Sequence, residues 1–67
     1  MVDWQKVYQD SQQYRVEIVK AILEEHELDP VIVDKKDSAY QWGHFELHVT
    51  ADQVIRAIKI ISEEVKL

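Results

Sequence analysis

The sequence predicts an α+β fold, a two-layer sandwich in which two helices cover one face of a three-stranded antiparallel sheet. Two segments, 12–26 and 50–65, repeat apolar residues at spacings of three and four, which indicates amphipathic helices. Three shorter segments, 4–9, 31–33 and 43–49, are rich in β-branched and aromatic residues, which is typical of strands. The order strand, helix, strand, strand, helix favours one sheet layer and one helix layer.

The chain of 67 residues is expected to form a single domain over residues 1–67. A domain of this size buries only about 60% of the surface that its unfolded chain exposes, and such domains often rely on disulfides, metals or partner chains. The sequence contains no cysteine, which excludes disulfides and thiolate metal sites. We therefore expect helix packing and self-association, as a homodimer, to stabilise the fold.

The first strand and the first helix follow from a change in spacing. After the strand at 4–9, Asp10 and Ser11 offer side-chain oxygens that can cap a helix. The helix is expected to run for about fifteen residues and to end near His26. One helical row is expected to contain Tyr14, Ile18, Ala21, Ile22 and Glu25, and the apolar stripe is expected to be widened by Val16, Val19 and Leu23.

The other two strands lie on either side of a polar and aromatic turn. Pro30 disfavours helical geometry at the residue before it, so the chain is expected to continue as an extended strand. In the segment 43–49, side chains alternate strictly between two faces. One face is apolar and the other polar: Phe45, Leu47 and Val49 against His44, Glu46 and His48.

The last helix is predicted from its own start signal and stripe. Thr50 followed by Gln53 matches a capping box. Asp52 and Arg56 have the spacing of a favourable ion pair on a helix surface. The buried face is expected to consist of Val54, Ala57, Ile58, Ile61 and Val65, with Ile55 and Ile60 beside it.

The order of the elements also predicts how the strands neighbour one another. A right-handed connection between the first and second strands leaves a gap that the third strand can fill. The expected spatial order is therefore second, third, first, as in a ferredoxin-like sheet without its usual last strand. The first strand would then have an open edge, and open edges pair readily with other chains.

This topology places the turn at 35–42 at the same end as the start of the first helix. Helix amides and nearby cations can bind an anion, and the same group of side chains can recognise a protein. A solvated turn, in which polar side chains satisfy local backbone groups, is the third interpretation. The candidate binding residues are Arg15, Lys35, Lys36, Asp37, Ser38, Tyr40 and Trp42.

His44, Glu46 and His48 share one face of a strand, about 7 Å apart from one to the next. Two imidazoles and a carboxylate are a ligand set that zinc accepts. The same spacing is also the ordinary polar face of an amphipathic strand, and we favour that interpretation. We expect no metal and no cofactor, and these three residues stay weak metal candidates.

Two further groups of residues bear on function. The aromatic residues Trp4, Tyr8, Tyr40 and Trp42 either close the ends of a thin core or mark an association surface. Catalysis is not expected, because there is no cysteine nucleophile and no catalytic motif surrounds any serine: Ser11, Ser38 and Ser62.

Charge and hydropathy indicate which classes of partner and which cellular compartment to expect. Thirteen acidic residues against eight basic ones give a net charge of −5. The lysines and arginines that nucleic acids and anionic membranes require are scattered. No signal peptide is recognisable, and no apolar segment is long enough to span a membrane. We expect a cytoplasmic protein that binds neither nucleic acid nor membrane.

The segments 14–25 (YRVEIVKAILEE) and 30–40 (PVIVDKKDSAY), together with 43–49 and the last helix, resemble a family of small bacterial proteins of unknown function. Its members are labelled putative prokaryotic signal-transducing proteins. The resemblance covers nearly the whole chain and implies a ferredoxin-like or nitrogen-regulator-like sandwich. It implies no reaction, substrate or cofactor, and the chain lacks the long loop that nitrogen regulators use for nucleotides.

Two functional hypotheses follow. The first is a non-catalytic regulatory or protein-interaction module, in signal transduction, that recognises an unidentified protein partner through the hairpin end. The alternative is a small-ligand or metal-sensing domain. It would use the turn at 35–42 with the start of the first helix, or the group His44, Glu46 and His48.

Overall fold

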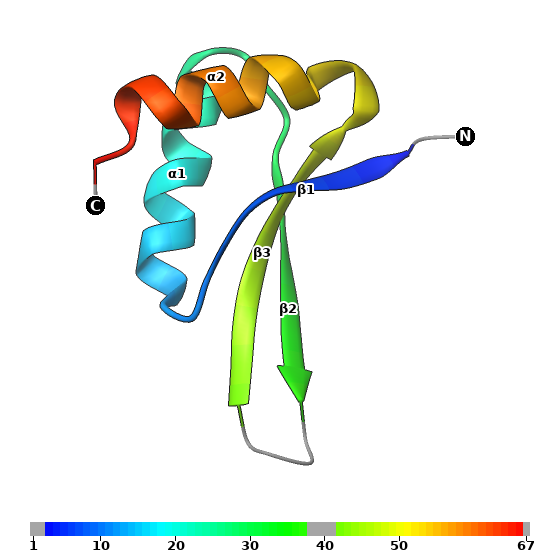
Figure 1. Ribbon diagram of the computed structural model, residues 1–67, viewed down its shortest axis with the longest axis vertical. Helices are drawn as coiled ribbons and strands as arrows, with labels where there is room; N and C mark the ends of the chain where they lie inside the picture. Colours follow the sequence, from blue (N-terminus) through cyan, green and yellow to red (C-terminus); the bar gives the residue numbers. More distant parts are fainter. Residues whose placement is uncertain (1–2, 38–41, 67) are drawn as a thin grey trace.

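The computed structural model describes residues 3–37 and 42–66. Three strands and two helices follow one another in the predicted order (Figure 1). A single turn of 3-10 helix, η1 (Ala51–Gln53), leads into the second helix. The elements are β1 (Trp4–Asp10), α1 (Gln13–Glu25), β2 (Val31–Asp37), β3 (Trp42–Thr50) and α2 (Val54–Glu64).

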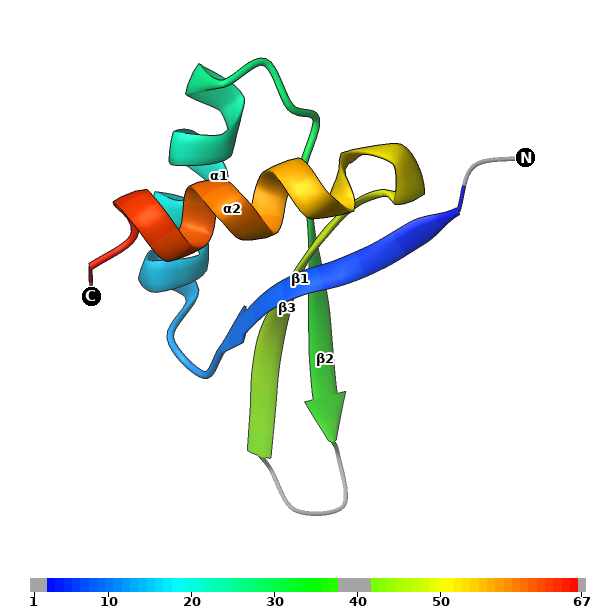
Figure 2. The same ribbon diagram turned by 45° about the horizontal axis from the view of Figure 1, so that its top comes forward.

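The sheet confirms the predicted topology. Its strand order is β1-β3-β2, and β3 pairs antiparallel with both neighbours. The fold is thus an α+β sandwich consistent with the ferredoxin-like class, with β1 and β2 as its two edges. Figures 1 and 2 show β1 crossing the β2–β3 pair at a wide angle. Strand twist and a bulge in β1 both favour such a crossing.

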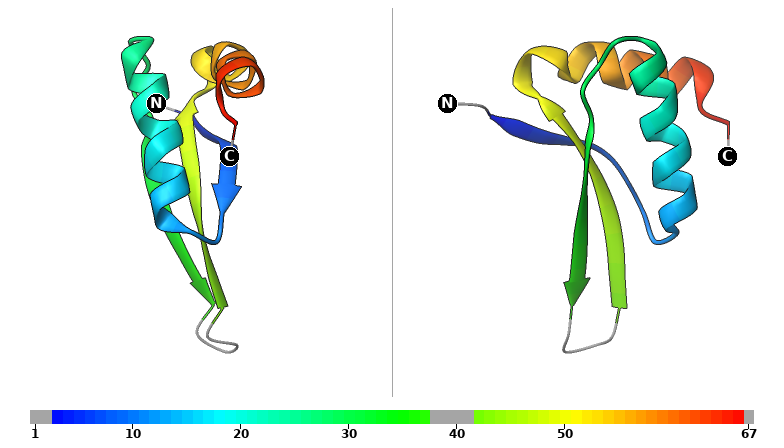
Figure 3. Two further views of the ribbon diagram at one scale, coloured as in Figure 1. Left: turned by 90° about the vertical axis from the view of Figure 1, so that its left-hand side faces the viewer. Right: turned by 180° about the vertical axis from the view of Figure 1, so that it is seen from behind.

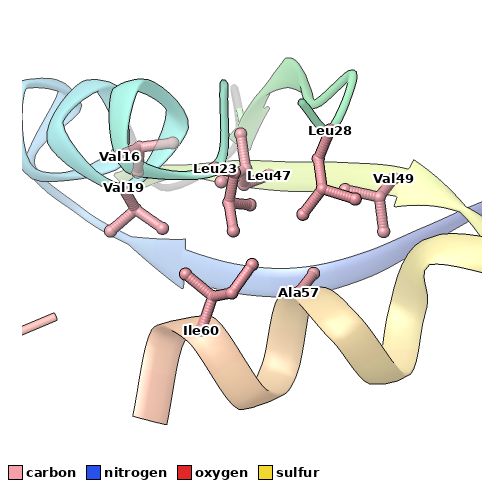
Figure 4. Close-up of a cluster of buried hydrophobic side chains, with 8 residues drawn as sticks. All are labelled: Val16, Val19, Leu23, Leu28, Leu47, Val49, Ala57 and Ile60. Carbon is pink, nitrogen blue, oxygen red and sulfur yellow. The ribbon is translucent and has the colours of Figure 1, made fainter. Parts of the chain in front are cut away.

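One hydrophobic cluster joins both helices to the sheet (Figure 4). Leu47 and Val49 of β3 are fully buried, as the alternation of β3 predicts. Burying a valine or leucine side chain is favourable by about 1.5–3 kcal/mol, so this small cluster dominates the stability of the domain. The helices and the connecting loop contribute Val16, Val19, Leu23, Leu28, Ala57 and Ile60.

The buried row of α1 differs from the one expected, and that of α2 differs at one position. In α1, Tyr14 and Ile18 are 55% and 41% exposed, while the row that was expected only to widen the stripe forms the core. In α2, Ala57 is buried, and Val54, Ile61 and Val65 pack against the core as expected. The exception is Ile58, which is 50% exposed, whereas Ile60, expected beside this row, is buried. Periodicity therefore identified both helices but did not select the row of α1 that packs.

Helix α1 ends in a Schellman motif, which explains how it stops among acidic residues. Leu28 N–H donates to the Leu23 carbonyl oxygen (3.1 Å), and Glu27 N–H donates to that of Glu24 (3.0 Å). Glu27 adopts a left-handed conformation with φ of 66°. Leu28 is 2% exposed and completes the hydrophobic contact of the motif.

Two expected contacts of the last helix are replaced by others. The Thr50 side chain makes no capping hydrogen bond, because the chain turns through η1 and Gln53 Oε1 instead accepts a hydrogen bond from Asp29 N–H (3.3 Å). In place of an ion pair with Asp52, Arg56 Nη2 donates to the His26 carbonyl oxygen (2.9 Å). That carbonyl lies at the C-terminal end of α1, where the helix dipole attracts a cation.

The start of α1 also lacks the expected side-chain cap. The N-cap residue is Gln12, which makes no side-chain capping hydrogen bond, and Asp10 Oδ1 accepts a hydrogen bond from the Gln12 N–H (2.8 Å), one residue before the helix begins. A separate observation concerns membranes: over residues 3–37 and 42–66, neither helix is long and apolar enough to cross a bilayer.

Candidate binding face of the sheet

Both helices pack on the face of the sheet that carries Leu47 and Val49. The opposite face has no covering layer within residues 3–37 and 42–66, and we call it the open face. Residues directly opposite each other in an antiparallel pair lie on the same face. The face therefore follows from the polar row of β3 and its partners in the strand register. Its described side chains are Trp4, Lys6 and Gln9 of β1, Val31, Val33 and Lys35 of β2, and His44, Glu46, His48 and Thr50 of β3.

A bulge in β1 decides which aromatic side chains belong to the open face. Lys6 pairs with His48 and Tyr8 pairs with Leu47, so Val7 is the extra residue. Val7 and Tyr8 both pack against the core, whereas Trp4 stays on the open face and is 45% exposed. Burial, together with the hydrogen bond that Tyr8 donates to Asp10, raises the pKa of the Tyr8 hydroxyl.

Glu46 lies at the centre of the open face and is held by two histidines. Its Oε1 lies 2.9 Å from His48 Nε2, and its Oε2 lies 2.8 Å from His44 Nε2. Because an ionised carboxylate can only accept hydrogen bonds, each imidazole donates from Nε2. The hydrogen bonds from His48 and then His44, with the charge of Lys6, lower the pKa of Glu46 to about 2.

Lys6 completes this cluster from β1. Its ammonium nitrogen lies 3.9 Å from Glu46 Oε2 and donates to Gln9 Oε1 (2.6 Å). The Glu46 side chain is only 13% exposed and that of His48 18%, whereas those of His44 and Lys6 are 41% and 47% exposed. The carboxylate is thus enclosed by donors, and the groups that solvent meets are cationic or neutral.

This arrangement does not resemble a metal centre. Among the described residues, no three histidine, aspartate or glutamate side chains are arranged to hold a metal ion. Both Nε2 atoms are directed at the carboxylate oxygens, and a lysine ammonium stands beside them. The chemistry available here is hydrogen bonding and charge recognition.

The β2–β3 hairpin projects beyond the end of β1 (Figure 1). The last pair between β1 and β3 is Asp10 with Phe45. The pairing of β2 with β3 continues for three more pairs, which begin with Lys35 opposite His44. At about 3.3 Å per residue, this arm extends roughly 10 Å past β1. Lys35 is exposed on it.

The structure describes the other predicted site residues only in part. Ser38 and Tyr40 lie outside the described residues. For Lys36, Asp37 and Trp42 the structure describes only the strand pairing at the end of the arm. Lys35 is thus the residue of the predicted turn whose side chain the structure places on the open face.

Arg15 makes its contacts within the start of α1. Its Nη1 lies 3.6 Å from Asp10 Oδ2, its Nε donates to the Tyr14 hydroxyl (3.1 Å), and its guanidinium stacks on the Tyr14 ring. The Gln12 amide, and less strongly Tyr8 and Arg15, lower the pKa of Asp10. Arg15 therefore stabilises the junction between β1 and α1.

Trp4 and Lys6 are among the open-face residues that sequence reasoning did not assign to the site, and they supply its exposed aromatic ring and its cation from β1. Their side depends on the position of the bulge, and no glycine or proline marks it. The signal available was the polar row of β3, because any residue paired with that row must share its face.

Charge is distributed unevenly over the molecule. The described side chains of the open face include two lysines and one glutamate, a formal charge of +1, while the whole chain carries −5. The acidic residues therefore concentrate elsewhere. A partner that approaches the open face therefore meets more cationic than anionic side chains among the described residues.

Comparison with known proteins assigns the chain to a family. Residues 4–64 match a family model described as putative prokaryotic signal transducing protein. The match begins with β1 and ends with α2, so it includes every element that builds the open face. No curated protein and no solved structure matches the chain. The chain belongs to the family of putative prokaryotic signal transducing proteins.

Proposed function

We propose that this chain is a non-catalytic protein-interaction module in prokaryotic signal transduction, and that it binds a partner protein through the open face. The observation that carries the proposal is the open face itself. It combines an exposed tryptophan, Trp4, with two exposed lysines, Lys6 and Lys35. Between them lies the Glu46 carboxylate, whose two oxygens already accept hydrogen bonds from histidines. Aromatic side chains surrounded by polar groups are typical of protein interfaces.

A binding role is favoured over catalysis by the state of the histidines. His44 and His48 direct Nε2 at Glu46, and His26 directs Nε2 at Glu64 (2.6 Å). Among the described serines, Ser62 donates to the Lys59 carbonyl oxygen (2.9 Å). None of these contacts pairs a nucleophile with a base, which general-base catalysis requires.

The proposal includes a cytoplasmic location and a homodimer. The dimer contact is proposed on the β1 side of the open face, around Trp4. Pairing through the β1 edge itself is disfavoured, because a bulge in an edge strand hinders the addition of another strand. This leaves the hairpin arm, on the β2 side of the face, for the partner protein.

Charge reversal tests the partner contact. The wild-type chain, Lys35→Glu and Lys59→Glu would each be used as bait in lysate of the native host. Lys59 is exposed on α2, which is not part of the open face. Lys59→Glu therefore makes the same change of charge outside the proposed contact. We expect Lys35→Glu to lose a specific partner that wild type and Lys59→Glu retain. Equal capture by all three would sink the proposal.

The rival hypothesis, a small-ligand or metal sensor, makes a different prediction. A ligand that binds only the native state raises the melting temperature. Zinc, nickel, nucleotides and phosphate should therefore leave the melting temperature of the wild-type chain unchanged if the interaction role is correct. A clear rise with any of them would favour the sensor instead.

A further inference from the structure

We infer that the partner protein contributes an extended segment that adds as a strand to the outer edge of β2. We further infer that this segment carries a carboxylate opposite Lys35, followed at alternate positions by two aliphatic side chains opposite Val33 and Val31. The inference rests on the proposed function and specifies the chemistry of the partner.

The two edges of the sheet differ in their fitness for strand addition. Edge β1 is interrupted by the bulge between Lys6 and Tyr8, and a bulge in an edge strand hinders the addition of another strand. Strand β2 pairs with β3 over all of its seven residues without a shift of register. Its backbone is therefore regular, and a regular open edge can accept an extended peptide through main-chain hydrogen bonds.

The surroundings of β2 leave this edge accessible. The strand order β1-β3-β2 places no described strand beyond it. Both views in Figure 3 show the C-terminal end of β2 and the paired start of β3 extending away from α1 and α2. Strand addition there would continue the antiparallel sheet, and we therefore assign the antiparallel direction.

The open-face row of β2 dictates the side chains of the added strand. Val31 is 43% exposed, Val33 is half-buried and Lys35 is exposed. An added strand would lie about 4.8 Å away, with its alternate residues directly opposite this row. Cross-strand contacts between aliphatic side chains and between opposite charges stabilise such pairs. From its N-terminal to its C-terminal end, the partner segment is therefore expected to have the pattern carboxylate, any residue, aliphatic, any residue, aliphatic.

The charges around Lys35 favour a carboxylate over a cation. Lys35 lies opposite His44 in the register, and His44 is held by Glu46. The Glu46 oxygens already receive both imidazoles and face Lys6. An incoming carboxylate would therefore add an acceptor where the open face has spare cationic groups. An incoming lysine would meet Lys35 with no carboxylate of this cluster left to separate them.

A second copy of the same chain does not supply this chemistry through β2. If two β2 strands paired antiparallel over all seven residues, Lys35 would lie opposite Val33 of the other copy, which offers no carboxylate. A register that brings Asp37 opposite Lys35 would pair only residues 35–37. We therefore assign the occupant to a different protein segment.

Two synthetic peptides with capped ends test the inference. One has the core Glu-Thr-Val-Thr-Val, and the other replaces the glutamate with lysine. Each is titrated into the full isotope-labelled chain, and amide shifts and hydrogen exchange are followed by NMR. We expect the glutamate peptide to shift and protect amides of residues 31–35 and to leave those of β1 unchanged. It should bind about twofold to fivefold tighter than the lysine peptide, as one exposed ion pair allows.

Charge reversal in the protein completes the test. Lys35→Glu should invert the preference between the two peptides, whereas Lys59→Glu should preserve it. Shifts centred on β1 or on the helices, equal affinity for both peptides, or no shift up to about 5 mM peptide would overturn the inference. If Lys35→Glu alone still loses the native partner while the peptides leave β2 unchanged, strand addition fails and the proposed function stands.

Discussion

Glu46 shows how one residue can set the character of a surface. It is the acidic group among the described side chains of the open face, yet both of its oxygens accept hydrogen bonds from imidazoles. The alternation of β3 predicted that Glu46 shares a face with His44 and His48, because side chains on a strand repeat every second residue. The contribution of Lys6 could not be predicted in the same way, since it depends on the bulge in β1.

The lowered pKa of Glu46 gives a pH-dependent prediction. The pKa of Glu46 is about 2 in the folded protein, against an ordinary value of 4.5. The ionised carboxylate therefore stabilises the fold fully at pH values above about 4.5. This contribution is lost as the pH falls from about 4.5 toward 2. We expect Glu46→Gln to lower the free energy of unfolding at pH 7, and the difference from wild type to shrink between pH 4.5 and 3.

Urea denaturation at several pH values measures this difference. Glu63→Gln, which changes an exposed carboxylate on α2, serves as the control and should differ little from wild type. A difference between wild type and Glu46→Gln that stays constant from pH 7 to 3 would contradict the proposed cluster.

At the scale of the elements, the sequence predicted where structure begins better than which surface it buries. All three strands and both helices lie where spacing placed them, but β2 continues through residues 35–37, which were predicted to belong to the turn. The buried row of α1, centred on Val19, was not selected, because Ile18 and Tyr14 satisfy the same helical period. Packing against both β3 and α2 decides between the rows, and that choice involves contacts distant in sequence.

The C-terminal end of α1 predicts a stabilising substitution. Glu27 has a positive φ, a conformation that costs a residue with a Cβ atom about 1–2 kcal/mol. Glycine avoids this cost but loses part of the gain through its more flexible unfolded state. We expect Glu27→Gly to raise the free energy of unfolding by about 0.5–1 kcal/mol.

The control for this substitution is Glu27→Ala, which removes the same negative charge from the helix end but keeps the Cβ atom. Its effect in urea denaturation should be smaller than that of glycine. If alanine and glycine stabilise equally, the charge next to the helix dipole, and not the backbone conformation, limits this helix end.

At the scale of the whole molecule, the thin core and the open face are two sides of one constraint. Two helices can bury one face of a three-stranded sheet, and the other face must be polar, paired with another molecule, or both. The sequence indicated this face through the histidines of β3. It could not indicate that the β2–β3 pairing outlasts β1, because the lengths of paired strands depend on the register of all three.

Self-association is predicted to depend on Trp4. Sedimentation of the wild-type chain at about 100 μM should give a dimer, because functional interfaces usually hold below that concentration. Trp4→Ala should sediment as a folded monomer. Ile55→Ala, which removes an 85% exposed side chain from α2, should remain a dimer. A monomeric wild type, or dissociation by Ile55→Ala alone, would show that the contact lies elsewhere.

The central claim is that the β2 side of the open face binds a partner protein, and cross-linking in cells measures this directly. A photoreactive phenylalanine derivative would replace Lys35 in one strain and Lys59 in another. Illumination should give a discrete cross-linked product with a second protein from position 35 and none from position 59. The same product from both positions, or no product from position 35, would contradict the account.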